Sequence, residues 1–127
     1  MAKITSIPIF LNKRLDAGSS STSDPIDLRY CASKYLFSLH HRAAPSTSGT
    51  CGTTIFSYQG CSIRDGSYGY PSTAGTFATA GTIKNQVTTF SPYLVPFIRI
   101  IATQTGVAPD DSNKGANSSI SAELNVQ

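Results

Sequence analysis

Two stretches near the carboxyl end of the chain decide the fold: PFIRIIATQTG at 96–106 and SISAELNVQ at 119–127. In the second stretch, apolar residues alternate strictly with polar ones. The apolar set is Ile120, Ala122, Leu124 and Val126. A period of two is that of a β-strand with one buried and one solvated face, and an amphipathic helix cannot produce it. The two stretches predict two strands of one sheet, joined by a hydrophilic hairpin loop over 106–117.

The length and composition predict a single all-β domain. A chain of 127 residues can bury about two-thirds of its unfolded surface without a metal or a disulfide framework. Only 13% of the residues are charged and glutamate occurs once, whereas surface helices are normally rich in Glu, Lys and Arg. Ser, Thr, Gly and Ala are abundant instead, so we expect little or no helix.

Further strand candidates precede these two stretches. They lie at 4–11, 26–31, 34–42, 53–64 and 83–90, with a weak candidate near 76–79. Pro8 lacks the amide hydrogen that a central strand needs, so residues 1–15 are expected to form an N-terminal arm or an edge strand. Residues 16–127 then form the domain proper, which we expect to be an antiparallel, jelly-roll-like β-sandwich of about seven or eight strands.

Alternation also assigns core faces to the earlier strands. The segment at 26–31 directs one set to the core, namely Ile26, Leu28 and Tyr30. The segment at 34–42 directs a second set to the core, namely Tyr35, Phe37, Leu39 and His41. Gly60 indicates a bulge or a close approach of two chain segments, and Asp65-Gly66 is a strong signal for a tight turn. The segment at 16–23, rich in Gly, Ser and Thr, is expected to be a loop.

No catalytic, cofactor-binding or metal-binding set emerges from the polar residues. His40 and His41 are neighbours on a strand and point to opposite faces, so they cannot chelate one ion together, and we expect them on the strand surface or in an interface. Cys31, Cys51 and Cys61 match no zinc spacing and are expected to be reduced thiols. The alternative is that Cys51 pairs with Cys61 across a hairpin. We expect neither enzymatic activity nor a cofactor.

Charge and hydropathy limit the partners. The net charge is +3, but the ten basic residues are scattered singly apart from Lys13-Arg14. A groove that follows a phosphate backbone needs clustered basic residues, so nucleic acid is not an expected partner. No segment is long and apolar enough to span a bilayer, and the first residues do not resemble a signal peptide. We therefore expect synthesis in the cytoplasm and no membrane partner.

Apolar residues in polar or flexible surroundings are the candidate contact residues. The low-complexity segment at 67–81 places aromatic side chains among Gly, Ser, Thr and Ala, and the first strand adds further apolar ones. Such side chains are costly to leave exposed, so we expect them in protein interfaces. The candidates are Ile7, Ile9, Phe10, Tyr68, Tyr70 and Phe77. The alternative is that they only cap the ends of the sandwich.

Several segments together resemble small β-sandwich structural proteins of tailed bacteriophages. They are DPIDLRY at 24–30, the turn at 65–66, SPYLVPFIRIIATQTG at 91–106 and ISAELNVQ at 120–127. The resemblance implies a non-enzymatic capsid-decoration, neck or tail component, which is synthesised in the host cytoplasm and located in the virion. The implied partners are further copies of the chain, in a homo-oligomer, and other virion proteins.

A carbohydrate-binding or receptor-binding module is the second hypothesis. In such a module Tyr68 and Tyr70 would stack on sugar rings, although the chain contains no tryptophan to strengthen this contact. A small hydrolase is the hypothesis with the least support, because the sequence defines no catalytic triad.

Overall fold

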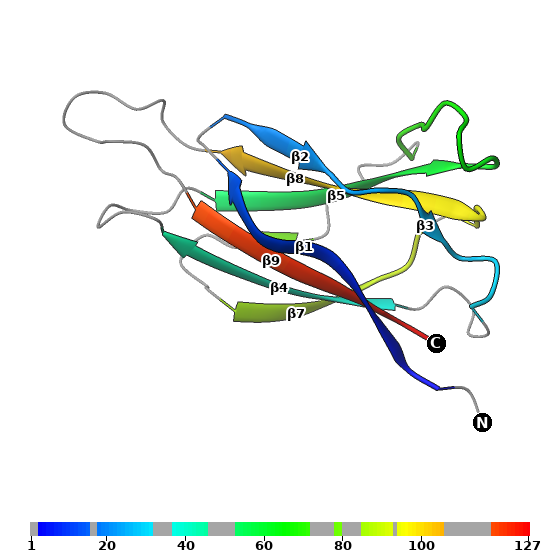
Figure 1. Cartoon of the computed structure of the whole chain (residues 1–127), viewed down its shortest axis with the longest axis horizontal. Helices are drawn as coiled ribbons and strands as arrows, with labels where there is room; N and C mark the ends of the chain where they lie inside the picture. The colour runs from blue at the N-terminus through cyan, green and yellow to red at the C-terminus, as the bar shows by residue number, and fades with distance from the viewer. Residues whose placement is uncertain are drawn as a thin grey trace.

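The fold is seen in a computed structural model that describes residues 3–15, 18–31, 37–45, 53–71, 78–79, 85–92, 94–105 and 118–127. These residues form nine strands and no helix. The strands are β1 (Thr5–Leu15), β2 (Ser20–Thr22), β3 (Ile26–Asp27), β4 (Phe37–Pro45), β5 (Thr53–Cys61), β6 (Ala78–Thr79), β7 (Asn85–Phe90), β8 (Phe97–Thr105) and β9 (Ser118–Val126). They form two antiparallel sheets that stack face to face (Figure 1), which confirms the predicted all-β sandwich.

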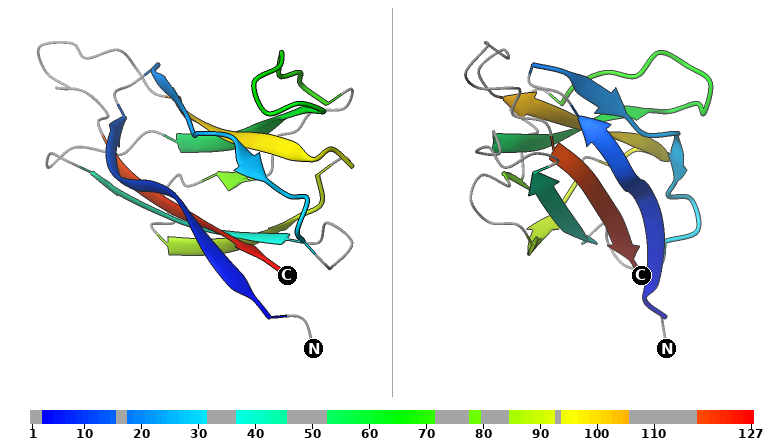
Figure 2. Two further views of the ribbon diagram at one scale, coloured as in Figure 1. Left: turned by 45° about the vertical axis from the view of Figure 1, so that its right-hand side comes forward. Right: turned by 60° about the vertical axis from the view of Figure 1, so that its left-hand side comes forward.

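The strand order is that of a jelly roll. One sheet, here called sheet A, has the order β1-β9-β4-β7, and the other, sheet B, has the order β2-β8-β5-β6. β3 pairs with β8 on the same side as β2 and follows it along that edge, so the two act as one interrupted strand. Apart from β2–β3 and β5–β6, every pair of consecutive strands is divided between the two sheets (Figure 2).

The two stretches that predicted the fold do form strands, but these strands lie in different sheets. β8 lies between β2 and β5 in sheet B, whereas β9 lies between β1 and β4 in sheet A. The predicted hairpin between them is therefore wrong. Alternation indicates which face of a strand is buried, but it does not indicate the neighbouring strands. The connection over 106–117 has more residues than a usual hairpin loop of about two to five. A connection of this length can cross the gap of about 10 Å between two stacked sheets.

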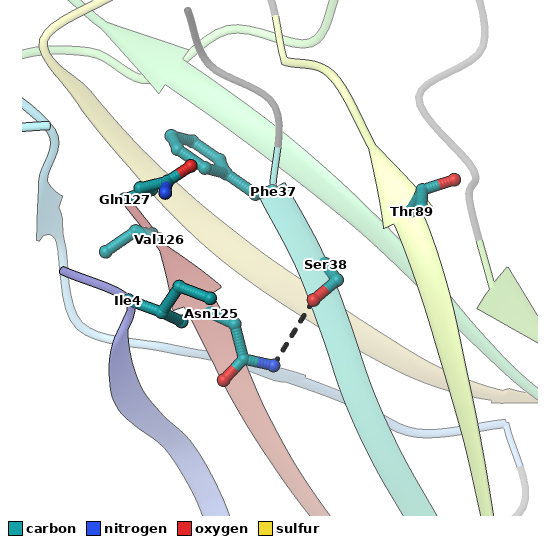
Figure 3. A pocket seen from close by; sticks show the side chains of 7 residues that line it. All are labelled: Ile4, Phe37, Ser38, Thr89, Asn125, Val126 and Gln127. Atoms are coloured by element: carbon teal, nitrogen blue, oxygen red, sulfur yellow. Dashed lines mark hydrogen bonds between the residues drawn. The ribbon is translucent and has the colours of Figure 1, made fainter. Parts of the chain in front are cut away.

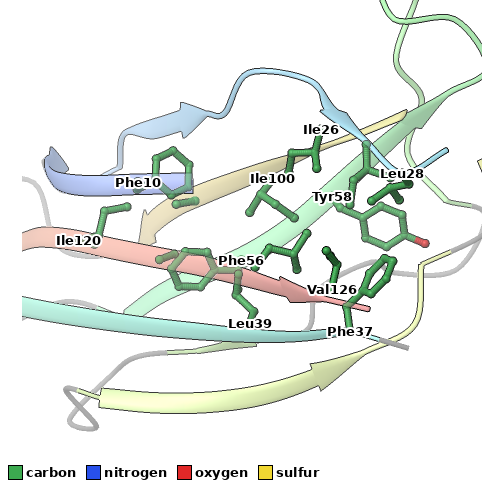
Figure 4. Packing of buried hydrophobic residues seen from close by; sticks show 14 of the residues in the cluster. Phe10, Ile26, Leu28, Phe37, Leu39, Phe56, Tyr58, Ile100, Ile120 and Val126 are labelled. Atoms are coloured by element: carbon green, nitrogen blue, oxygen red, sulfur yellow. The ribbon is translucent and has the colours of Figure 1, made fainter. Parts of the chain in front are cut away.

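The core lies between the two sheets (Figure 4). The predicted apolar face of β9, from Ile120 to Val126, is buried, and β8 contributes Ile98, Ile100 and Ala102. Burial of one large apolar side chain stabilises the fold by about 1.5–3 kcal/mol. The other buried members of this cluster are Phe10, Leu15, Ile26, Leu28, Phe37, Leu39, Phe56 and Tyr58.

Two segments near the amino end differ from the predictions. The loop predicted at 16–23 contains β2, because pairing with β8 outweighs the weak strand propensity of its Ser and Thr residues. The strand predicted at 26–31 is shorter and ends in a turn, which the Cys31 amide closes by donating to the Leu28 carbonyl at 3.1 Å. This turn directs Tyr30 away from the core, and the side chain is 85% exposed.

Gly60 is a point of close approach, as predicted. A Cβ at this position would lie 2.7 Å from Cγ2 of Val95, in the segment that leads into β8. The backbones of Gly60 and Gly69 exchange two hydrogen bonds of 2.9 and 3.0 Å, and the predicted turn at 65–66 lies between them. The end of β5 is therefore packed against the segment that precedes β8, and the hairpin that follows β5 returns to pair with Gly60.

Candidate functional site

Three segments leave the sandwich at one end, and we call the surface that they form the loop end. The first two are residues 28–31 and 61–71, and the third is described over 91–92 and 94–96. Asp27 of β3 and Cys61 of β5 both pair with Phe97, the first residue of β8. The segments that follow β3 and β5, and the segment that leads into β8, therefore meet sheet B at neighbouring positions at the same end of its strands (Figures 1 and 2).

Most of the exposed large apolar side chains among the described residues belong to the segments of the loop end. The described residues include seven exposed large apolar side chains, and four of them lie here: Tyr30, Ile63, Tyr70 and Leu94. Single exposed apolar residues are ordinary, whereas several on one surface indicate contact with another molecule. The other three, Ile4, Leu11 and Val87, lie on or beside the two edge strands of sheet A. The loop end is therefore the main candidate for a contact site.

An arginine fixes the position of Tyr68 in this surface. The Arg99 guanidinium carbon lies 4.6 Å from the centre of the Tyr68 ring, which is a cation–π distance. Arg99 Nε donates to Gln59 Oε1 at 2.7 Å, and the Tyr68 hydroxyl donates to the Arg64 carbonyl at 2.7 Å. Burial is the main cause that raises the pKa of the Tyr68 hydroxyl above its ordinary value. The ring is therefore held in place, with the Arg99 guanidinium against it.

A second arginine orders the turn after β3. Arg29 donates from Nε and Nη2 to the Asp27 carboxylate at 2.8–3.2 Å, and its guanidinium carbon lies 5.1 Å from the centre of the Phe97 ring. The side-chain hydrogen bonds from Arg29 hold the pKa of the Asp27 carboxyl below its usual value. This arrangement fixes the backbone next to the exposed Tyr30, so part of the loop end is ordered before any partner binds.

The predicted interface residues take different positions in the structure. Phe10 is only 7% exposed and belongs to the core of the chain itself, and Ile7 and Ile9 are half-buried against that core. Tyr70 is 68% exposed at the loop end, where Tyr68 also lies. Phe77 lies outside the described residues.

Sequence reasoning missed three members of the loop end. The alternating pattern over 26–31 predicts a core position for Tyr30. Ile63 and Leu94 were not singled out, although Leu94 lies between Pro92 and Pro96, and prolines often mark an exposed turn.

The outer face of sheet A carries a polar network that spans β7, β4 and β9. Arg42 Nη2 donates to Glu123 Oε1 at 2.6 Å, and Arg42 Nη1 lies 3.2 Å from His40 Nδ1. His40 Nε2 lies 2.6 Å from Asn85 Oδ1. The tautomer with hydrogen on Nε2 satisfies both histidine contacts, because Nδ1 then accepts and Nε2 donates. The network joins the edge strand β7 to the two central strands of the sheet.

His41 lies in the core, as the alternation over 34–42 predicts, and this corrects the other expectation, of a role on the strand surface or in an interface. Its side chain is fully buried on the inner face of β4, and its ring centre is 4.9 Å from that of Phe56. Burial lowers the pKa of the imidazole below its ordinary value, because the interior disfavours the charged form. Nδ1 has no hydrogen-bond partner. The predicted opposite orientation of the two histidines is confirmed, since His40 lies on the outer face.

A pocket of about 330 Å³ lies where β1 begins and β9 ends (Figure 3). One hydrogen bond crosses its wall, from Asn125 Nδ2 to Ser38 Oγ at 3.3 Å. Apolar side chains form most of the remaining lining, so the pocket suits an apolar group better than a charged one. The lining residues are Ile4, Phe37, Ser38, Thr89, Asn125, Val126 and Gln127.

The remaining sequence hypotheses concern cysteines, metals and membranes. Cys31 and Cys61 are free thiols, and Cys51 lies outside the described residues. Within the described ranges, no three His, Cys, Asp or Glu side chains come together as metal ligands would. No helix that could cross a bilayer occurs in the part of the chain that the structure describes.

The sequence matches no model of a known protein family, and no curated protein is significantly similar to it.

Proposed function

We propose that the protein is a non-enzymatic structural component of a bacteriophage virion, of the capsid-decoration, neck or tail kind. It works by symmetric assembly with copies of itself and by contact with other virion proteins. Jelly rolls serve as viral capsid domains and also as lectins, so the fold alone does not choose between assembly and sugar binding. The choice rests on the surface of the domain.

The observation that carries the proposal is that four of the seven exposed large apolar side chains of the described residues belong to the segments of the loop end. These side chains are exposed and do not belong to the core cluster, so packing within the domain does not account for them. Apolar and aromatic side chains on an ordered backbone are typical of the centre of a protein interface. Tyr30 and Tyr70 supply large contact area, and the arginine contacts nearby reduce the entropy lost on binding.

A carbohydrate-binding module is the second candidate, because Tyr70 is open to solvent at the loop end. Sugar stacking needs a free aromatic face. The Arg99 guanidinium already lies against the Tyr68 ring, which leaves less of that ring for a sugar. Tyr68 and Tyr70 are therefore not an equivalent stacking pair, and this weakens the second candidate relative to the first.

The test measures the mass of the purified protein by light scattering over a wide concentration range, beside its binding to immobilised glycans. The proposal predicts a defined oligomer and no glycan binding. A protein that stays monomeric at every concentration would contradict symmetric assembly. Glycan binding that disappears in Tyr70→Ser would instead support the carbohydrate-binding module. Tyr70 is exposed, so this variant should keep the fold of the wild-type protein.

A further inference from the structure

Sheet edges are the places where one β-protein can add a strand from another. Among the described strands, sheet A ends in β1 and β7, and sheet B ends in the pair β2–β3 and in β6. The strands at the edges of sheet B have only two or three residues each. β1 and β7 are therefore the edges with enough length to pair with a further strand.

β1 carries several features that oppose strand addition. Pro8 has no amide hydrogen to donate, and the register with β9 shifts on both sides of Phe10. Asn12 has a φ of 47°, in the left-handed region, which bends the strand. Lys13 and Arg14 add charge. Natural β-proteins protect exposed edges by these means.

β7 has none of these features. Its six residues, NQVTTF, pair with β4 in unbroken register and include neither a proline nor a charged residue. No described strand pairs with its other edge. Asn85, Val87 and Thr89 are exposed on the outer face, and Val87 is the apolar one among them at 62% exposure. A regular, uncharged and β-branched edge of this kind is a template for another strand.

Side chains on the neighbouring strand hold this edge in place. His40 Nε2 lies 2.6 Å from Asn85 Oδ1, and Arg42 connects His40 to Glu123 on the central strand β9. An edge that is ordered in the free molecule loses little entropy when a further strand binds.

We propose that β7 pairs antiparallel with β7 of a second copy across a two-fold axis, which joins the two copies of sheet A into one continuous sheet. The inference rests on the proposed function, because it names the surface by which the chain assembles with itself. A two-fold interface uses the same patch on both copies, so the patch must be complementary to itself.

The sequence of β7 meets this condition in one register. Directly opposed residues of antiparallel strands face the same side of the sheet. The two-fold axis between the two strands must therefore lie level with one residue, which then opposes its own copy. With the axis at Val87, each Asn85 opposes Thr89 of the other copy and each Gln86 opposes Thr88. Val87 then meets its own equivalent. Apolar meets apolar, polar meets polar, and no like charges are opposed, which favours a second copy as the added strand.

Cysteine cross-linking of the full chain tests this register. Opposed residues in antiparallel strands have Cα atoms about 4.5–5.5 Å apart, which is within the range for a disulfide. Val87→Cys should therefore form a covalent dimer under mild oxidation. Thr89→Cys is the matched control, because each copy would lie about 13 Å, four residues along the strand, from its equivalent. It should cross-link no more than the wild-type chain, whose three cysteines give the background.

Charge substitution is the second measurement. Val87→Lys opposes two ammonium groups at the axis and should weaken self-association about tenfold or more, as measured by light scattering. Leu11→Lys is the control, because Leu11 is even more exposed, at 77%, but lies on the protected edge β1. It should leave the oligomer unchanged. Thermal unfolding checks that both variants keep the fold.

The outcomes separate this inference from the proposed function. If the wild-type protein oligomerises, but Val87→Cys does not cross-link above background and Val87→Lys keeps the oligomer, the β7 contact is refuted and assembly through another surface remains. If the wild-type protein is monomeric at every concentration, the proposed assembly itself fails, and the β7 contact fails with it.

Discussion

Gly60→Ala is expected to destabilise the domain, because the added methyl group collides with Val95. The new Cβ would lie 2.7 Å from Val95 Cγ2, about 0.8 Å less than the 3.5 Å at which carbon atoms begin to make a favourable contact. Overpacking of this kind typically costs about 1–3 kcal/mol. Replacing glycine also reduces the entropy of the unfolded chain, which returns about 0.4–1 kcal/mol. We expect a net loss of about 1–2 kcal/mol in the free energy of unfolding.

The assay is urea denaturation of a double-mutant cycle. Val95→Ala removes the colliding methyl groups, so adding Gly60→Ala to Val95→Ala should cost nothing or stabilise slightly. Gly69→Ala is a matched control, because a Cβ at Gly69 meets no atom within 4 Å. If Gly60→Ala costs the same with and without Val95→Ala, the segment before β8 does not pack on the end of β5 as described, and the account of the loop end fails.

Three further predictions concern polar side chains. His41→Leu should flatten the pH dependence of stability, because the buried imidazole stabilises the wild-type fold in its neutral form. This contribution is present above the ordinary pKa of about 6.5 and falls as the pH drops below that value. Equal pH dependence in the thermal unfolding of both proteins would refute the buried position of His41. Thr54→Val removes the 2.6 Å hydrogen bond to Gln104 Oε1 and should cost about 1–2 kcal/mol in urea denaturation, whereas Thr54→Ser should retain the bond. A cycle of Arg42→Ala and Glu123→Gln should give a small favourable coupling that weakens with salt, and a coupling of zero at low salt would show that the pair contributes nothing.

The local parts of the fold could be predicted from the sequence. The period of two in β9 and in β4 predicts their buried faces, because this signal depends only on the spacing of side chains along one strand. The sequence also predicts the close approach at Gly60 and the turn at 65–66. Glycine has no Cβ and tolerates both a close neighbour and the backbone angles of a tight turn.

The non-local parts could not be predicted in the same way. β8 and β9 were placed in one sheet because each is a good strand, but the partners of a strand depend on contacts with distant residues. Arg42 and Glu123 meet only because β4 pairs with β9, and the turn that exposes Tyr30 interrupts an otherwise regular pattern.

The loop end and the β7 edge depend on the strand order. The sequence predicts a strand at 83–90, but the place of β7 at an edge follows only from the order of sheet A. The sequence instead predicts contact residues in the first strand, because that strand combines several apolar residues with Pro8. In the structure, Phe10 of that strand belongs to the core.

Hydrogen–deuterium exchange of the wild-type protein, measured by mass spectrometry at low and high protein concentration, tests the central claim most directly. If the chain assembles through β7, exchange across 85–90 should slow as the concentration rises. Exchange across 5–15, the other edge strand of sheet A, should stay unchanged. Exchange across 85–90 that is the same at every concentration, whether or not other segments become protected, would contradict the account.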